Sequence, residues 1–271
     1  MAGQPFRTQF MESVQTTRIV LALLLGLAAA AANLAGGLMI ALGAWPRRML
    51  KYFIALGAGF MLATALLEMI PESVRLRGAA GSFLSFSWFG GANAVFTIVL
   101  AGYLLVHFFE HTVAPHFHFG EETHHEAVSH AHASYAALLG LMIHTFFDGV
   151  AIASGLLVSP SLGAVIFIAV FLHKIPEGFT VASLMLASGE SRRAAFLSSA
   201  VLGAATLAGV ALMFLLRGFV ADALPFSAGV TLYVAASDLI PEVNHEPGIA
   251  VPLLVFLGVA AMLGLKVAFH I

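Results

Sequence analysis

Two short patterns of ionisable residues lie inside long apolar segments of this chain. His144 is followed four residues later by Asp148, and His173 is followed four residues later by Glu177. On an α-helix, four residues correspond to about 6 Å of rise and roughly 40° of rotation, so each imidazole faces the same way as its carboxylate. Two such faces turned toward each other would offer four ligands to a metal. Neutral imidazole with carboxylate suits Zn²⁺, Fe²⁺, Mn²⁺ and their neighbours, and the ligand types do not choose among them.

The segments around both patterns are long and apolar enough to cross a bilayer. They run over residues 138–158 and 162–186, and about 20 apolar residues suffice for one crossing. Ionisable side chains at that depth cost roughly 2.5 to 3.5 kcal/mol each, so they imply a partner or a task. Pro176 lies inside the second segment and frees a backbone carbonyl one turn earlier, which is tolerated where a helix faces protein or water. These features predict a metal pathway lined by the two helices.

The composition is that of a polytopic membrane protein. Hydrophobic residues make up 60% of the chain and charged residues 10%, whereas about a quarter of the residues of a soluble domain are charged. We predict an all-α membrane protein with one transporter domain over residues 1–271. Its eight transmembrane helices are expected at 19–43, 52–71, 92–113, 134–158, 162–186, 194–217, 220–241 and 249–270. The first run is too long for the core of a signal peptide, so we expect it to be a retained span.

An internal repeat relates the two ends of the chain. The sequence of residues 68–72, EMIPE, matches DLIPE at 238–242, and residues 31–36 match residues 204–209. Spans 1 and 2 therefore resemble spans 6 and 7, and the five-span offset makes the copies run in opposite directions. Inverted repeats of this kind are common in secondary transporters. The predicted arrangement is three, two and three spans, with the two His-acid patterns at its centre.

Further ionisable residues lie near the ends of spans and are candidate waypoints for a metal ion. The repeat would place Glu68 and Glu72 at one mouth of the pathway, and a second group at the opposite mouth, namely Asp238, Glu242, His245 and Glu246. At the end of span 3, one helical face presents His107, Glu110 and His111. The competing interpretation of the mouth groups is that they are ordinary interfacial charges.

One long polar loop, at residues 114–133, is rich in histidine. Its acidic residues are interspersed with six histidines, His116, His118, His124, His125, His130 and His132. Their spacing fits no single rigid site, although neutral imidazole and carboxylate at this density suit loose binding of a divalent metal. A flexible solvated linker is the equally weighted alternative.

Two residues bear on how many metals the central site could hold. Lys174 follows His173 directly, and its ammonium would repel a second cation, which favours a single metal site. Lys174 could also form a structural ion pair with an acid such as Asp148 or Asp238. Met61, in the second span, could add a thioether ligand or could be an ordinary packing residue.

These residues and motifs resemble the ZIP (Zrt/Irt-like) family of divalent metal transporters, particularly its GufA-like bacterial branch. The resemblance covers nearly the whole chain: the eight spans, the inverted repeat, the histidine-rich loop between spans 3 and 4, and the paired motifs of spans 4 and 5. It implies metal binding at mid-membrane, alternating access, both termini outside and the histidine-rich loop in the cytoplasm. The family's transport ligands map onto His144, Asp148, His173, Glu177 and Met61.

The chain departs from the family pattern where a second metal would bind. Many members have Asn where this chain has Thr145, and a carboxylate or similar ligand where it has Lys174. Span 6 also contains no acid between Ala194 and Leu216. The resemblance therefore implies one metal site in this chain.

We expect a transporter that moves a divalent cation, with zinc favoured over Cd²⁺, Fe²⁺ and Mn²⁺, toward the cytoplasm across a bacterial inner membrane. The expected partners are the lipid bilayer and the metal ions; no organic cofactor is expected, and a homodimer is left open. The chain shows no basic face for nucleic acid, and without cysteine it has no disulfides or thiolate metal sites. The alternatives are an intramembrane zinc-dependent hydrolase, for which no His-Glu-x-x-His motif is present, and a metal sensor that does not transport.

Overall fold

The computed structural model describes residues 4–42, 47–79, 92–112, 131–244 and 248–269. Eight helices in these ranges are long and apolar enough to cross a membrane, and the same ranges contain no strand. The prediction of an all-α protein with eight spans is therefore confirmed. The arrangement in three, two and three spans stays a prediction.

The helices follow one another with short connections in the second half of the chain. Their bounds are α1 Gln4–Leu42, α2 Arg47–Thr64, α3 Ile70–Ala79, α4 Ala92–Thr112, α5 Ala131–Val158, α6 Pro160–Ala187, α7 Arg192–Leu215, α8 Val220–Tyr233, α9 Ile240–Asn244 and α10 Ala250–Phe269. Between α5 and α6 only Ser159 intervenes, and its hydroxyl accepts a hydrogen bond from the Leu162 amide. Because Ser159 caps a helix that begins with proline, the chain reverses sharply there, and α5 and α6 pack side by side.

Spans 2 and 7 each contain a π-helical segment at the same place in the repeated motif. In span 2 it runs over Ala65–Met69 and in span 7 over Val234–Leu239. Each lies just before an Ile-Pro-Glu sequence, at Pro71 and Pro241. Proline has no amide proton and crowds the preceding turn, and a π-helical turn takes up this distortion without ending the helix. The extra residue in the turn also changes the direction of Glu68 and Asp238 relative to a regular helix.

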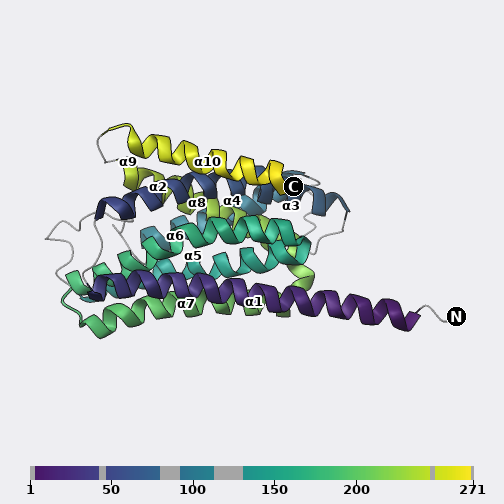
Figure 1. Cartoon of the computed structure of the whole chain (residues 1–271), viewed down its shortest axis with the longest axis horizontal. Coiled ribbons are helices and arrows are strands. Elements are labelled where there is room, and N and C mark those ends of the chain that lie inside the picture. Colours follow the sequence, from purple (N-terminus) through teal and green to yellow (C-terminus); the bar gives the residue numbers. More distant parts are fainter. Residues whose placement is uncertain (1–3, 43–46, 80–91, 113–130, 245–247, 270–271) are drawn as a thin grey trace.

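Two helix limits differ from the sequence prediction. The first helix begins at Gln4, not near residue 19, so its polar N-terminal part continues the helix of the span and projects past the other helices (Figure 1). Span 2 does not end at Pro71 but continues as α3 to Ala79. In both cases apolarity defines the membrane segment but not the helix, because polar residues continue a helix once it has begun.

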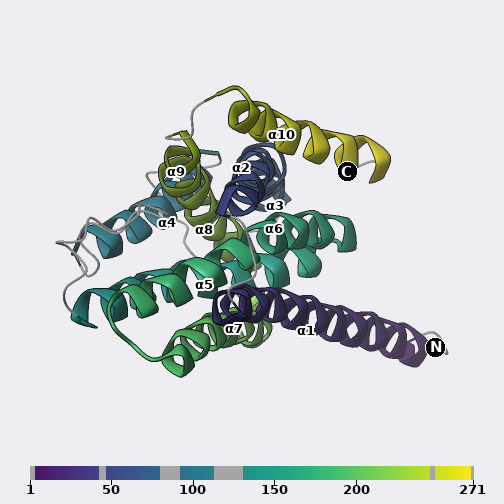
Figure 2. The ribbon, with the colours of Figure 1, turned by 60° about the vertical axis from the view of Figure 1, so that its left-hand side comes forward.

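The eight spans form two groups of four helices. One group consists of α1, α5, α6 and α7, and the other consists of α2, α4, α8 and α10 (Figures 1 and 2). Within each group the backbones meet closely at glycine: a Cβ on Gly209 of α7 would lie 1.9 Å from the Phe146 oxygen of α5, and one on Gly229 of α8 would lie 1.9 Å from the Val99 oxygen of α4. Between the groups, α2 packs on α6 and α5 packs on α8. In the first group the glycine contacts interlock the helices, and in the second group they join α4 to α8 and α2 to α10.

Candidate metal site

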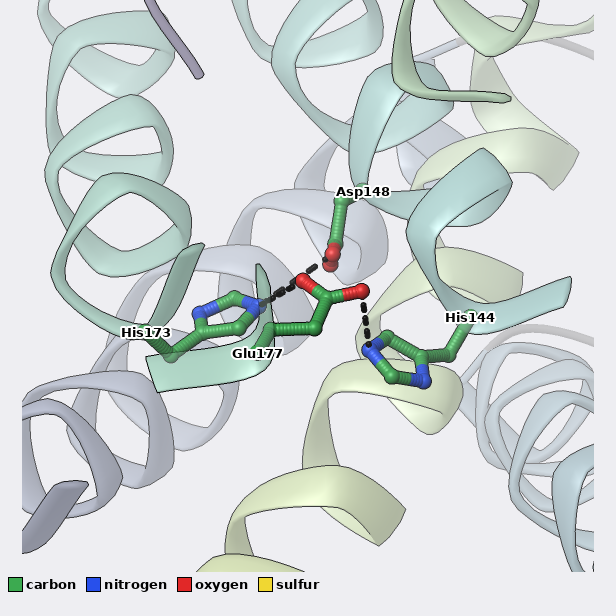
Figure 3. A group of neighbouring side chains, drawn as sticks. All are labelled: His144, Asp148, His173 and Glu177. Atoms are coloured by element: carbon green, nitrogen blue, oxygen red, sulfur yellow. Dashed lines mark hydrogen bonds and ion pairs between the residues drawn. The ribbon is translucent and has the colours of Figure 1, made fainter. Parts of the chain in front are cut away.

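The two His-acid patterns meet at the contact between α5 and α6. Helix α5 presents His144 and Asp148, and α6 presents His173 and Glu177, so that the four side chains point toward one another (Figure 3). One ligand atom from each residue can be chosen so that all four lie within 4.8 Å of one another. All four residues are buried, with at most 2% of their surface exposed.

The shortest imidazole-to-carboxylate distances cross from one helix to the other. His173 Nε2 lies 3.2 Å from Asp148 Oδ2, and His144 Nε2 lies 3.4 Å from Glu177 Oε1 (Figure 3). Metal–ligand distances of about 2.0 to 2.1 Å in a tetrahedron correspond to separations between ligands of about 3.3 Å. The two cross-helix pairs already have this spacing, so a small contraction would suffice to surround a first-row divalent ion.

The orientation of His173 suits a metal ligand. Its Nδ1 lies 3.1 Å from the backbone oxygen of Ala169, one turn earlier in α6. A hydrogen bond from Nδ1 to that carbonyl would leave Nε2 as the lone-pair nitrogen, directed toward Asp148 and Glu177. Such a second hydrogen bond is what usually orients a metal-binding imidazole.

Lys174 lies inside the same group and contacts both carboxylates. Its Nζ is 2.7 Å from Asp148 Oδ2, it donates a short hydrogen bond to Glu177, and the whole residue is buried. From the sequence, either Asp148 or Asp238 was a possible ion-pair partner of Lys174. In the structure, Lys174 pairs with Asp148 and also with Glu177. Thr145 completes the arrangement, because its hydroxyl accepts from Lys174 Nζ at 3.3 Å and donates to Glu177. The two carboxylates and the ammonium together hold a net charge of about −1, which one divalent ion would reverse.

The glycines that follow the two acids determine how closely other helices pack behind the site. A Cβ on Gly149 would lie 2.0 Å from the backbone oxygen of Thr206 in α7, and one on Gly178 would lie 2.0 Å from that of Asn33 in α1. Only glycine permits these approaches. Helices α1 and α7 therefore lie directly against the helices that hold the four side chains.

One mouth group lies at the π-helical segment of span 2. Glu68 Oε1 is 2.6 Å from Lys266 Nζ of α10, and the same ammonium donates to the Leu67 carbonyl at 3.0 Å. In a regular α-helix that carbonyl would accept a hydrogen bond from the amide of residue 71, but Pro71 has no amide proton to donate. Glu72 pairs with Arg75 at 2.9 Å. Lys266 was not predicted as part of this group, because nothing in its spacing in the sequence relates α10 to span 2.

The other mouth group lies at the π-helical segment of span 7. Glu110 of α4 lies beside Asp238 and Tyr233 of span 7. His107 and His111 lie on the same face of α4, with ring centroids 4.1 Å apart. The structure thus gathers a second set of acids and imidazoles where α4 packs against span 7. Tyr233 was not singled out in the sequence, since a single tyrosine in an apolar span has no distinguishing spacing.

Several predicted residues have no described role in this geometry. Met61 is fully buried in the apolar cluster around α2, so its role as a ligand stays a prediction. The side chains of Glu242 and His132 lie outside the described part of the structure, as do His245, Glu246 and the other histidines of the loop.

Comparison with known proteins identifies the family. The family model described as ZIP zinc transporter matches residues 118–266, more than half of the chain. This chain belongs to the ZIP zinc transporter family. The matched region contains all four residues of the central group, together with Thr145 and Lys174. ZIP family members are transporters, so the enzyme alternative is excluded for this chain.

Individual ZIP relatives are similar at modest identity. Zinc transporter ZIP9-A of Xenopus laevis is 26% identical over 243 residues, covering 74% of this chain and 79% of the relative. The mouse zinc transporter SLC39A7 is 31% identical over 143 residues, which is 49% of this chain but only 29% of that relative. The Caenorhabditis elegans zinc transporter zipt-7.2 is 31% identical over 117 residues, covering 40% of this chain and 25% of its own length.

Proposed function

We propose that this ZIP family protein moves Zn²⁺ into the cytoplasm through a single site formed by His144, Asp148, His173 and Glu177. The observation that supports it is the convergence of two imidazoles and two carboxylates, all buried, with one imidazole and one carboxylate from consecutive turns of each of two helices. The relatives are named zinc transporters, which makes zinc the first substrate to test, ahead of Cd²⁺, Fe²⁺ and Mn²⁺. Selectivity would come from site geometry, since raw affinity favours copper.

The single site is proposed because of Lys174. Its ammonium occupies the side of the two carboxylates on which Thr145 lies, where the family resemblance would place a second metal. A buried ammonium beside a second divalent ion would face strong repulsion in a medium of low dielectric constant. Lys174 and Thr145 are therefore proposed as the substitutions that replace the second site.

The proposed route runs from the Glu68 and Glu72 mouth, past the central site, to the group of Glu110, Asp238 and the neighbouring histidines. Helix α5, which carries His144, packs on α8 of span 7, and this packing supports a connection between the centre and the second mouth. Glu242, His245, Glu246 and the histidine-rich loop would extend the path there, with the loop loosely binding released metal. All 271 residues are proposed to form one transport domain.

Alternating access would come from movement of one helix group against the other. The central ligands belong to one group, whereas the mouth residues Glu68 and Asp238 belong to the other. A shift of α5 and α6 relative to α2 and α8 would therefore carry the ligands from one mouth toward the other. The four central side chains would replace the ion's water at the centre, and the two mouths would open in turn.

The membrane and the orientation are also proposals. The resemblance to the GufA-like branch supports a bacterial inner membrane, with both termini outside and the histidine-rich loop in the cytoplasm, although the relatives named above are eukaryotic. No organic cofactor and no nucleic acid are part of the proposal. A homodimer is left open.

The test is metal flux into proteoliposomes that contain the purified protein and a fluorescent zinc indicator inside. We expect zinc flux in the wild type and its collapse in a His173→Ala, Glu177→Ala variant. The exposed Leu215→Ala variant serves as a matched control, since its side chain is 81% exposed at the end of α7. Folded protein that binds zinc but gives no flux would contradict transport and favour a metal sensor.

A further inference from the structure

Asn33 is a buried polar residue that the proposed function does not use. It lies in α1 with 0% of its surface exposed. Among the residues that the structure describes, neither its Oδ1 nor its Nδ2 has a hydrogen-bond partner. A buried carboxamide without partners is costly, so a leucine of similar size would stabilise a purely structural position. The carboxamide therefore has a use that this arrangement of side chains does not show.

The packing of α1 places Asn33 behind the central site. The backbone oxygen of Asn33 lies against Gly178, which directly follows Glu177 and is one turn beyond Lys174. A Cβ on Gly36 would lie 2.1 Å from the Ile175 oxygen and 2.6 Å from the Phe179 amide nitrogen of the same helix. Because α1 and α6 are the first and fifth of the successive spans, the two helices run in the same direction. Side chains on a helix tilt toward its N-terminus. The Asn33 carboxamide is therefore tilted from the level of Gly178 toward the level of Lys174.

Lys174 and a bound metal would compete for the same oxygens. The ammonium lies 2.7 Å from Asp148 Oδ2 and contacts Glu177 Oε2. A divalent ion bound by these carboxylates would lie within a few ångströms of Nζ, and both are positive. The ammonium must move away, yet it remains buried and still needs an acceptor. Its flexible four-carbon stem allows it to reach a new one.

We propose that Asn33 Oδ1 is the second position of the Lys174 ammonium, taken when a divalent metal binds the central site. The amide is neutral, so it does not draw the ammonium away from the carboxylates in the absence of metal, but it accepts a hydrogen bond from it once the metal arrives. Asn33 is thus a positioning residue that acts through Lys174. The inference rests on the proposed metal site.

The test is a double-mutant cycle on the zinc affinity of the purified full-length protein, measured by competition with a chelator of known affinity. Asn33→Leu should weaken zinc binding about tenfold or more in the wild-type background. In the Lys174→Met background, where no ammonium needs a second acceptor, the same change should alter affinity less than about twofold. Asn33→Ser, which keeps an oxygen acceptor, should retain affinity closer to that of the wild type.

The thermal stability of the metal-free variants provides a separate readout that does not depend on zinc. Asn33→Leu should be at least as stable as the wild type without metal. An unchanged affinity of Asn33→Leu would overturn the proposal, and so would an equal loss in both Lys174 backgrounds, which would mark Asn33 as a direct ligand or a structural residue. If Lys174→Met does not fold, Lys174→Gln replaces it in the cycle.

A His173→Ala variant separates this proposal from the proposed function. If zinc binding depends on His173 but shows no coupling between Asn33 and Lys174, the metal site stands and the second position of Lys174 is wrong. If zinc binding does not depend on His173 in any background, the metal site itself is wrong.

Discussion

At the scale of single residues, the charge balance of the centre depends on Lys174. Two carboxylates, Asp148 and Glu177, share one ammonium in a fully buried place. Removing one partner of a buried ion pair typically costs about 3 to 5 kcal/mol, because the remaining charge is left unpaired. A divalent cation can supply the missing charge. Lys174 therefore stabilises the protein without metal and opposes the binding of metal.

The Lys174→Met variant should destabilise the metal-free protein and favour the binding of metal. We expect its thermal unfolding temperature without metal to fall below that of the wild type, and the increase on adding zinc to be larger than in the wild type. Differential scanning fluorimetry in detergent measures both. Lys174→Arg, which keeps the positive charge, is the control and should show a zinc-induced increase no larger than that of the wild type. Equal increases in wild type and Lys174→Met would contradict the role of Lys174.

Zinc binding should also depend on pH, because metal and protons compete for His144 and His173. An imidazole must be neutral to bind a metal, and imidazoles ordinarily titrate near pH 6.5. We expect the affinity for zinc to fall by about tenfold or more between pH 7.5 and pH 5.5. Isothermal titration in buffers of different protonation enthalpy would also reveal release of protons at the lower pH. An affinity that stays constant over this range would argue against imidazole ligands.

At the scale of elements, the sequence predicts the spans well but not their internal irregularities. Continuous apolar runs identify the eight helices, and the four-residue spacing within α5 and α6 is enough to predict which faces hold the central side chains. The π-helical segments before Pro71 and Pro241 were not predicted, because apolarity and proline position do not distinguish a kink from an added residue. The contacts of Lys174 with Glu177 and of Lys266 with Glu68 depend on side-chain direction and on tertiary packing, which spacing does not determine.

The close approach of helices at glycine leads to a prediction about Gly209. A Cβ at this position would lie 1.9 Å from the Phe146 oxygen, so Gly209→Ala should push α7 away from α5 and lower the free energy of unfolding by about 1 to 3 kcal/mol. Gly264→Ala is the matched control, since a Cβ there meets nothing within 4 Å. Alanine is also the better helix former, so this control should be neutral or stabilising. Thermal unfolding in detergent compares the two, and equal stability of both variants would contradict the predicted clash.

At the scale of the whole molecule, the two helix groups are the units whose relative movement the proposed transport mechanism would use. Close glycine contacts bring backbones together within the first group and within the α2–α10 and α4–α8 pairs of the second. Between the groups, a Cβ on Gly57 of α2 would lie 3.5 Å from the Leu172 Cβ of α6, an ordinary van der Waals distance. The four central side chains of α5 and α6 lie in one group, and the π-helical segments with Glu68 and Asp238 lie in spans of the other. An interface of ordinary packing is easier to shift than one of interlocked backbones.

A disulfide between the groups should therefore stop transport. The chain has no cysteine, so a Gly57→Cys, Leu172→Cys pair can be introduced cleanly, and its Cβ separation of 3.5 Å fits a disulfide. We expect zinc flux to be lost on oxidation and restored by dithiothreitol. The control pair is Gly26→Cys with Val210→Cys, which joins α1 to α7 within one group at 3.8 Å. Its flux should survive oxidation, and a loss of flux in both pairs would contradict movement between these groups.

The central claim is that two imidazoles and two carboxylates surround one divalent metal between α5 and α6. X-ray absorption at the zinc edge, on purified protein loaded with one zinc per chain, tests it most directly. We expect about four nitrogen and oxygen neighbours at about 2.0 to 2.1 Å, without a second zinc nearby, and loss of this signal in the His173→Ala, Glu177→Ala variant. A zinc spectrum that is the same in that variant, or one typical of hydrated zinc in the wild type, would contradict the account.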